Sequence, residues 1–236
     1  MKPPVVRLRS VVSTQSVALE LAEQGAPDRT VVIAEHQSAG RGRRGARWED
    51  EPGASLLMSL VLRPHLEPAR LPTLSYVAAV AVAEALATVA SVEPRLKWPN
   101  DVMVGPRKIA GILLETRLGR APVTTILGIG INLGQRQFPP SLRDRATSVA
   151  IETGLAVDRE AVLTALLERF DAWCQRLEAA GFDVVRQRWL ELSDTIGRTV
   201  TVDGTRGVAL DLDAEGALVL DTGGVRRRVL AGALEA

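Results

Sequence analysis

The sequence is poor in cysteine, in aromatic residues and in net charge, and each shortage narrows the range of functions. Its single cysteine, Cys174, has no second cysteine to pair with, which excludes an internal disulfide and indicates a reducing compartment. Aromatic residues make up 3% of the 236 residues and the formal net charge is +1, so no global field draws the chain to nucleic acid or to an anionic membrane. Any basic site must therefore be local.

The sequence shows neither an export signal nor a clear membrane span. The first residues, MKPPVVRLRS, hold two prolines where a signal peptide has an apolar core. The most apolar run, Leu74 to Val92, approaches the length of a membrane span, but it is rich in alanine and interrupted by Glu84. We therefore predict a buried helix there, in a cytoplasmic protein without a membrane partner.

The remaining pattern predicts an α+β fold in two domains. Ser13 and Asp158 are typical caps at the start of helices, and Trp173 and Trp189 lie at helical spacing among apolar residues, as core residues do. After Ser193 the pattern changes to short alternating strands bounded by glycines, which predicts a small barrel. The predicted elements are helices at 13–25, 74–92, 158–181 and 182–192, strands at 30–35 and 55–62, a β-meander over 95–134, and domains at 1–193 and 194–236.

One glycine-rich stretch, GRGRRG from Gly40 to Gly45, has the spacing of a dinucleotide-binding loop but carries three arginines. A dinucleotide fold needs a helix directly after this loop. The chain instead has Pro52 and Gly53 and leads into a strand, so the dinucleotide interpretation is rejected. A flexible loop remains, whose guanidinium groups suit contacts with carboxylate and phosphate oxygens. Taken alone, an arginine cluster of this kind is more often a solvated loop without a ligand.

A second stretch, KWPNDVMVGPRKIAGILLE from Lys97 to Glu115, contains strands separated by a Pro-Asn-Asp turn. Its third strand carries Lys108 beside the small residues Ala110 and Gly111. A lysine on a strand is ordinarily solvated, and Trp-Pro-Asn is ordinarily a turn, so neither feature alone indicates a function. Together with the arginine-rich loop they form a recognisable set.

With STQS (13–16), EHQSAGRGRRGARW (35–48) and GIGINLG (128–134), this set closely resembles the biotin–protein ligases, in the family's order and over nearly the whole chain. The resemblance implies a mixed-sheet catalytic domain followed by an SH3-like barrel. It also implies an enzyme that uses ATP and Mg²⁺ to form biotinyl-5′-AMP and then transfers biotin to a lysine of a biotin carboxyl carrier domain. Bringing the carboxylate of biotin to the phosphates of ATP needs fixed cations, which explains arginines in this loop.

The resemblance also assigns residues to roles. Lys108 is expected to act as the main electrostatic catalyst, with Arg43, and Asp101 is expected to orient the carrier amine. Trp48 is expected to cover the adenine, and Mg²⁺ to be carried mainly by the ATP phosphates, with the protein ligands unknown. The expected biotin contacts are Ser13, Thr14, Gln15, Gln37, Arg41, Gly42, Arg43, Lys108 and Gly111, and the expected ATP contacts are Arg41, Arg43, Arg44, Trp48, Asn100, Lys108 and Asn132.

Two departures from the family pattern matter. Gln15 stands where the family often has asparagine, which leaves its contact with biotin open. The ligase motifs also begin within the first residues, so no N-terminal DNA-binding domain and no operator binding are expected. Lipoate–protein ligase and an RNA-binding arginine patch remain as alternatives, although few aromatic residues and low net charge disfavour the latter. Monomer and homodimer both remain open.

Overall fold

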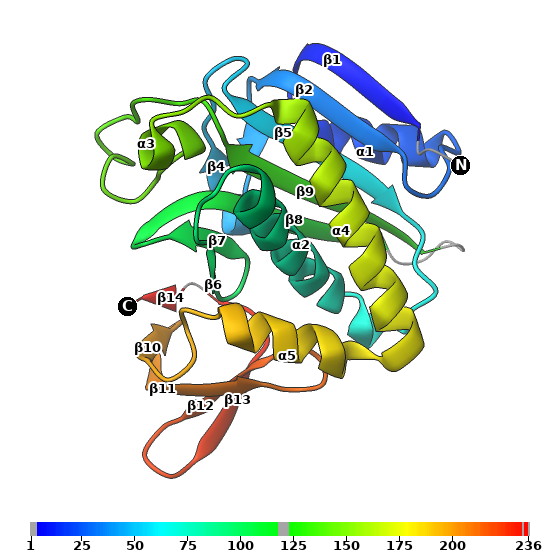
Figure 1. Cartoon of the computed structure of the whole chain (residues 1–236). Coiled ribbons are helices and arrows are strands. Elements are labelled where there is room, and N and C mark those ends of the chain that lie inside the picture. Colours follow the sequence, from blue (N-terminus) through cyan, green and yellow to red (C-terminus); the bar gives the residue numbers. More distant parts are fainter. Residues whose placement is uncertain (1–3, 118–122, 233, 236) are drawn as a thin grey trace.

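The computed structural model describes residues 4–117, 123–232 and 234–235, and its centre is one large mixed sheet (Figure 1). The first two strands of the sheet, β1 and β2, pair in parallel, and every other pair is antiparallel. In spatial order the strands are β1 (Val5–Val11), β2 (Val31–Gln37), β5 (Ser55–Leu62), β9 (Thr124–Asn132), β8 (Arg107–Arg117), β7 (Asp101–Val104) and β6 (Arg95–Lys97).

The two faces of this sheet differ in what covers them. Because strand side chains alternate, Ile33 and Met58 lie in the large core on the side of α2 (Thr73–Val89) and α4 (Arg159–Ala180). Their neighbours, such as Val32, face the opposite side, where α1 (Thr14–Glu23) packs on β2, β5 and β9. We call this second side the α1 face. The single helix leaves the β8 end of the α1 face open for a site.

Helix α2 is mostly apolar because most of its surface is enclosed. It contacts β6, β7 and β8 on one side and the helices α4 and α5 (Phe182–Leu192) on the other. The segment Pro68–Val89, which includes the short 3₁₀ helix η2 (Pro68–Arg70), has a mean hydropathy of 1.5, enough by length and composition to cross a membrane. However, 67% of that window is buried inside the molecule, so α2 is the predicted core helix.

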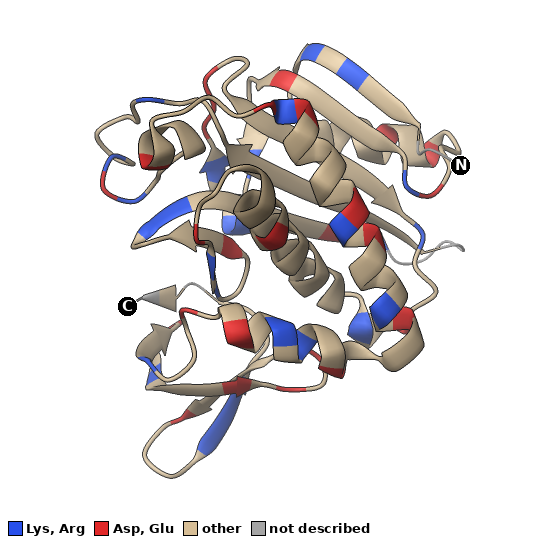
Figure 2. Ribbon diagram, viewed as in Figure 1, with Lys and Arg blue, Asp and Glu red and all other residues tan. Residues whose placement is uncertain are grey.

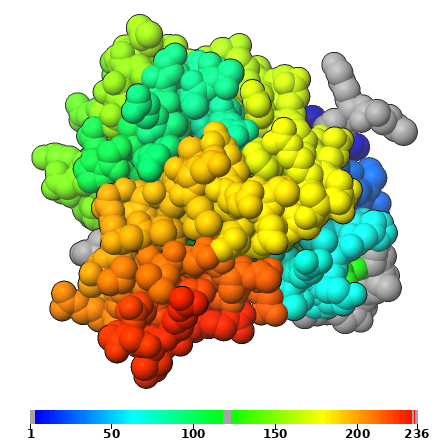
Figure 3. All heavy atoms as spheres, turned by 60° about the horizontal axis from the view of Figure 1, so that its bottom comes forward, coloured from blue at the N-terminus to red at the C-terminus, as the bar shows by residue number. Residues whose placement is uncertain are grey.

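The C-terminal strands form a separate antiparallel sheet, which we call the C-terminal barrel, and α5 lies between it and the rest of the molecule (Figures 1 and 3). At the junction Tyr76 packs edge-on against Trp189 and donates its hydroxyl hydrogen to the carbonyl of Gly216 in the barrel. In spatial order the barrel strands are β13 (Arg226–Val229), β12 (Leu218–Asp221), β11 (Thr205–Leu212), β10 (Thr199–Val202) and β14 (Leu234–Glu235).

The fold class and the long elements predicted from the sequence are confirmed. The meander appears as β6 to β9, and the helices that begin after Ser13 and Asp158 have these side chains as N-caps. The domain boundary after residue 193 stays a prediction. Ser193 still pairs with Leu96 of the large sheet, and the barrel begins a few residues later, at β10. Figure 2 shows acidic and basic residues interspersed over the fold, apart from a run of arginines on β13.

Some elements were not predicted. The sequence pattern did not predict strand β1 or the short helix α3 (Val149–Thr153). The short strands of the arginine-rich stretch were also not predicted: β3 (Gly40–Arg41) pairs with β4 (Arg47–Trp48) around the 3₁₀ turn η1 (Arg43–Gly45). We call residues 40–48 the arginine loop. It leads into β4 and β5 rather than a helix, so rejecting a dinucleotide fold was correct.

Candidate active site

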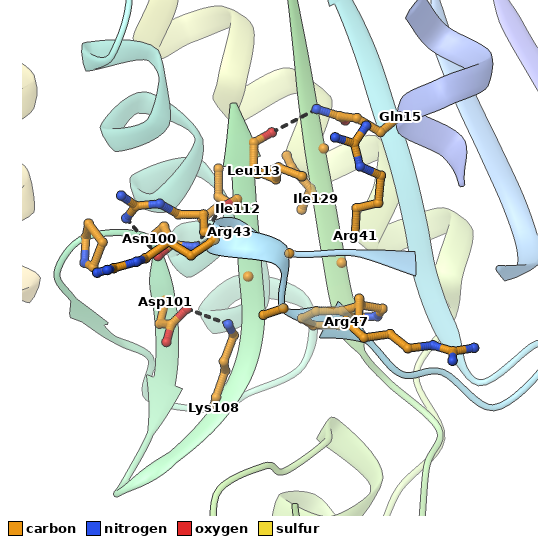
Figure 4. Close-up of a pocket in the computed structure, with 18 of the residues that line it drawn as sticks. Gln15, Arg41, Arg43, Arg47, Asn100, Asp101, Lys108, Ile112, Leu113 and Ile129 are labelled. Atoms are coloured by element: carbon orange, nitrogen blue, oxygen red, sulfur yellow. Dashed lines mark hydrogen bonds and ion pairs between the residues drawn. The ribbon is translucent and has the colours of Figure 1, made fainter. Parts of the chain in front are cut away.

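A cavity of about 650 Å³ lies on the α1 face and extends under the arginine loop (Figure 4). The start of α1, the arginine loop, the β6–β7 turn and strands β5, β8 and β9 line it, and the barrel adds Gly232 and Leu234. The cavity therefore brings together segments from both sheets. The predicted site residues that line it are Ser13, Thr14, Gln15, Gln37, Arg41, Gly42, Arg43, Arg44, Trp48, Asn100, Asp101, Lys108 and Gly111.

Glycines form the floor of the cavity because other side chains lie directly on the strands. Gly111 of β8 and Gly130 of β9 are register partners, and the ring of Trp48 rests above both. A Cβ atom on Gly130 would lie 2.6 Å from Cε2 of this ring, closer than real contacts allow. A Cβ on Gly128 would lie equally close, 2.6 Å, to Oε1 of Gln15. The alternating glycines of GIGIN thus keep one face of β9 flat.

Buried polar side chains gather at the α1 end of the cavity. The hydroxyl of Thr14 lies 2.9 Å from the hydroxyl of Ser59 and donates to Oε1 of Gln37 at 3.1 Å. Ser59 in turn donates to Oε1 of Gln15, whose Nε2 donates to the carbonyl of Ile126 at 3.1 Å. The network fixes these side chains, while their oxygens keep lone pairs for further N–H donors. This end of the cavity suits a small polar head group.

Ser13 sits at the start of this network and has a hydroxyl hydrogen to spare. Its oxygen caps α1 by accepting from the backbone N–H of Gln15 at 3.3 Å. Among the residues that the structure describes, no acceptor is recorded for its own hydrogen. Ser13 is only 1% exposed, and buried polar groups normally have a hydrogen-bond partner. A carbonyl oxygen of a bound ligand would provide that partner. Capping and ligand binding are therefore compatible at this residue.

Lys108 reaches the cavity because β8 contains a bulge. Asp101 pairs with Gly111 and Val102 with Ala110, but Met103 pairs with Lys108, so Ile109 is an extra residue. In a regular strand Lys108 would share the face of Ala110 and point into the core. The bulge sends both Ile109 and Ala110 to the core and turns Lys108 to the side of Gly111.

The charged end of the cavity is centred on an ion pair. Nζ of Lys108 lies 2.5 Å from Oδ1 of Asp101 and 5.7 Å from the centre of the Trp48 ring. The backbone of Lys108 is held on its other edge, since its N–H donates to the carbonyl of Arg145 at 2.8 Å and its carbonyl accepts from Thr147 at 2.9 Å. The ammonium group is therefore fixed before any ligand arrives, as an electrostatic catalyst requires.

The arginines of the loop point in different directions, as Figure 4 shows for Arg41, Arg43 and Arg47. Arg43 donates to Oδ1 of Asn100 at 3.3 Å, whereas Arg41 lies 2.6 Å from Glu115 and Arg44 lies 2.5 Å from Asp203 of the barrel. Burial lowers the pKa of Arg43, and the positive charge of Arg44 lowers it further, yet an arginine remains charged at any physiological pH. Arg43 is thus a partly desolvated, permanent cation beside the cavity.

Asn132 is the predicted site residue that the structure places outside the cavity lining. It ends β9, where its Nδ2 donates to the carbonyl of Thr147 at 3.0 Å and its Oδ1 accepts from Gln135 at 3.2 Å. Its side chain therefore serves the chain itself in this structure. Within the described residues there is also no group of three or more His, Cys, Asp and Glu side chains that could hold a metal ion.

Comparison with known proteins places the chain in a family. The Biotin/lipoate A/B protein ligase family matches residues 8–132. Over 219 residues the chain is 38% identical to the biotin–[acetyl-CoA-carboxylase] ligase of Paracoccus denitrificans, a match that covers 88% of this chain and 90% of that protein. The chain belongs to the biotin/lipoate protein ligase family. The resemblance noted in the motifs is thereby confirmed, and the protein is an enzyme of this ligase family.

Other members of the family agree with this placement. The chain is 38% identical over 217 residues to the bifunctional ligase/repressor BirA of Bacillus subtilis, covering 89% of this chain and 67% of that protein. The biotin protein ligase of Aquifex aeolicus, solved in complex with biotin and ATP, superposes with a TM-score of 0.86 at 29% identity, over 98% of this chain and 97% of that one. The similarity extends through the barrel.

Some residues of this ligase pocket were missed by sequence reasoning. Ser59 lies in the apolar strand SLLMSLVL, and the only sign of a special role was its own polar side chain among apolar neighbours. Gly128 and Gly130 were within a quoted motif, and their alternate spacing could have shown that they share one face. Arg145 and the barrel residue Leu234 also line the cavity. Nothing local marks these two, because only the fold brings them to the site.

Proposed function

We propose that this ligase joins biotin to ATP to form biotinyl-5′-AMP and then transfers the biotinyl group to the lysine of a biotin carboxyl carrier domain. One observation carries the proposal: a single cavity has a buried polar network at one end and fixed cations at the other. A bicyclic urea with a carboxylate tail needs both ends. Ser13 and Thr14 line the first end, and Lys108 and Arg43 line the second.

In the first half-reaction, a carboxylate oxygen of biotin attacks the α-phosphorus of ATP, and the bond to the leaving pyrophosphate breaks. Lys108 would lie between the two anions and offset their repulsion, because its ammonium group is held in place by the backbone and by Asp101. Arg43 and Arg41 would contact the carboxylate and phosphate oxygens, with Arg44 as a further phosphate contact. Gly42 and Gly111 would allow the ligand to approach the backbone closely.

The polar network would recognise the ureido head. Ser13 can donate its free hydrogen to the ureido oxygen, and Thr14 can accept from a ureido N–H. Gln15 and Gln37 would act by holding this network, because Nε2 of Gln15 donates to the carbonyl of Ile126 and Oε1 of Gln37 accepts from the backbone N–H of Thr14. This is how glutamine can replace the asparagine that is frequent in the family.

The nucleotide would occupy the side of Trp48 and Asn100. The Trp48 ring lies flat on the glycine floor, and its buried Nε1 is unpaired among the described residues. A planar adenine can stack on such a ring. Asn132 stays a predicted ATP contact, which requires its amide to leave Thr147 and Gln135 when the nucleotide binds. Because Asp101 is the only carboxylate among the described lining residues and is paired with Lys108, these residues do not fit a protein-held Mg²⁺. Mg²⁺ is therefore expected to enter bound to ATP.

In the second half-reaction, the carrier lysine loses a proton and its nitrogen attacks the carbonyl carbon of the mixed anhydride, while the bond to AMP breaks. Asp101 would orient the incoming amine once Lys108 is engaged with the phosphate. The carrier domain is the expected partner, and monomer and homodimer both remain compatible. Operator binding is not expected for these 236 residues, because their net charge of +1 provides no general attraction to DNA.

The alternatives make different demands on the same residues. Lipoate lacks a urea, so it would leave the buried hydroxyls of Ser13 and Thr14 without ligand partners. An RNA-binding patch is favoured by an excess of basic residues and by aromatic rings on which bases stack, whereas the net charge is +1 and aromatic residues make up 3% of the chain. Neither alternative uses the whole cavity.

The direct test incubates the protein with biotin, ATP, Mg²⁺ and a biotin carboxyl carrier domain, and measures the mass of the carrier. A gain of one biotinyl group is expected, and it should disappear without ATP or when the carrier lysine is changed to arginine. Parallel reactions contain lipoate in place of biotin. A gain with lipoate alone, or no gain with a competent carrier, would refute the proposal.

A further inference from the structure

Two tight turns from distant parts of the chain meet beside the cavity. One is the apex of the arginine loop at Arg44 and Gly45, and the other is the Asp203–Gly204 turn between β10 and β11 of the barrel. Nη1 of Arg44 lies 2.5 Å from Oδ1 of Asp203, across a sequence separation of 159 residues. This ion pair links the loop that carries the proposed catalytic cations directly to the barrel.

The backbone conformations of these two turns have the same origin. Asp203 and Gly204 both have positive φ, 46° and 81°, as the central residues of a type I′ hairpin do, so the hairpin itself accounts for Asp203. Arg44 (φ 55°, ψ 33°) and Gly45 (φ 77°) are likewise the central residues of a tight turn between β3 and β4, closed by a hydrogen bond from the N–H of Ala46 to the carbonyl of Arg43 at 3.0 Å. This turn places the side chain of Arg44 at the apex of the loop, where it contacts the barrel.

The contact with Asp203 fixes more than one arginine. The turn around Arg44 is closed by a hydrogen bond from the N–H of Gly42 to the carbonyl of Ala46 at 2.7 Å. Arg43 directly precedes Arg44 in this turn, and its side chain donates a hydrogen bond to Asn100. If the apex moved, the side chain of Arg43 would leave the cavity with it.

Asp203 is itself held close to the cavity. A Cβ atom on Gly232 would lie 3.2 Å from Oδ2 of Asp203, and Gly232 lines the cavity. The neighbouring Val202 pairs with Leu234, which lines it too. The carboxylate therefore extends from a wall of the site towards the loop that covers it.

We propose that Asp203 is a positioning residue for biotinyl-adenylate formation: by holding Arg44, it keeps the arginine loop closed over the cavity before ATP binds. The proposal rests on the proposed function for its kinetic test but not for its structural test. Asp203 touches no substrate. Its role is to raise the fraction of molecules in which Arg43 already faces the cavity.

The kinetic test compares Asp203→Asn with Glu215→Gln. Glu215 is a matched control, because it pairs with Arg228 on the same barrel at 2.7 Å, and both acidic side chains are 47% exposed. Loss of an exposed ion pair changes such an equilibrium by at most about fivefold, so the KM for ATP should rise about two- to fivefold in Asp203→Asn while kcat stays the same. Asp203→Glu should restore most of the affinity, and Glu215→Gln should leave both constants unchanged.

The structural test needs no activity. Trypsin cleaves after arginine, and the loop offers Arg41, Arg43, Arg44 and Arg47, so cleavage there, located by mass spectrometry, reports how often the loop opens. Asp203→Asn should increase the initial cleavage rate within the loop severalfold in the absence of substrates, and Glu215→Gln should not. Unfolding temperatures close to that of the original protein exclude general destabilisation as the cause.

Each outcome distinguishes the proposals. Unchanged cleavage and unchanged KM in Asp203→Asn would overturn the positioning role. A lower KM would also overturn it, because Asp203 would then compete with ATP for Arg44. Faster cleavage in a protein that has no ligase activity would leave the loop contact standing and refute the proposed function instead.

Discussion

Replacing Lys108 by methionine should separate catalysis from stability. Methionine keeps most of the apolar stem but removes the charge that lies 2.5 Å from Asp101. Removing one fixed donor aimed at developing charge typically costs about 10²- to 10³-fold in rate. We expect a loss of this size in biotinyl-adenylate formation, because the carboxylate of Asp101 would then remain in the cavity without its cation and repel both anionic substrates.

The same substitution should change stability little. The side chains of Lys108 and Asp101 are 32% and 27% exposed, which places the pair near the surface class of ion pairs. Such pairs contribute about 0–1 kcal/mol. For a chain of this size, 1 kcal/mol corresponds to about 2–4 °C in unfolding temperature. The expected shift is therefore at most a few degrees, far too small to explain a loss of activity by unfolding.

The assay is pyrophosphate release during a single turnover with biotin and ATP, together with the unfolding temperature. Arg107→Met is the matched control, because Arg107 is the neighbouring residue on β8, is 33% exposed and pairs with Glu152 at 2.8 Å outside the cavity lining. It should retain a rate within about twofold of the original, as a surface ion pair contributes little. If Lys108→Met adenylated biotin at a similar rate, Lys108 would not be the electrostatic catalyst.

Three further predictions follow from individual contacts. Gly130→Ala should displace the tryptophan ring that lies on it and raise the KM for ATP, whereas Gly134→Ala, whose Cβ would lie 3.5 Å from Ala54, should be tolerated; equal KM values in the two variants would contradict the role of the glycine floor. Ser59→Ala should raise the KM for biotin about two- to tenfold, the range for one lost hydrogen bond, and an unchanged KM would show that the network does not position the ureido contacts. Arg159 donates to both oxygens of Glu35 and holds the pKa of Glu35 below its usual value, so this stabilisation is present above the usual value and is lost as the pH falls below it. Glu35→Gln should thus lower the unfolding temperature by about 1–3 °C at pH 7, and this difference should shrink as the pH falls below about 4 and through the lowered pKa of Glu35; a difference independent of pH would contradict this.

Much of the fold was predictable because its signals are local. The caps Ser13 and Asp158 and the stop signal Gly181 lie within one turn of the helix ends that they define. The strand at Ser55–Leu62 was predicted with its observed bounds, since it is a continuous apolar run buried on both faces. Such features depend on neighbours in sequence, and the sequence contains them completely.

Strand β1 could not be predicted from the same kind of signal. In its sequence, VVRLRSV, apolar and polar residues alternate only in part, and none of the seven residues is fully buried. It becomes a strand because it finds a parallel partner in β2, with Arg7 reaching Glu160 at the start of α4. That contact spans 153 residues, and no window of local sequence contains it.

The identity of the site residues was readable from motifs, but their geometry was not. In the sequence RKIAGI, a period of two places Lys108 on the same side as Ala110 and Ile112, both of which are buried in the core. The local pattern therefore argues that Lys108 faces away from Gly111. One extra residue, Ile109, reverses this relation by forming the bulge opposite Val102 and Met103. The bulge arises from the pairing of β7 with β8, so the direction of the proposed catalytic lysine is a property of two strands and not of the motif that contains it.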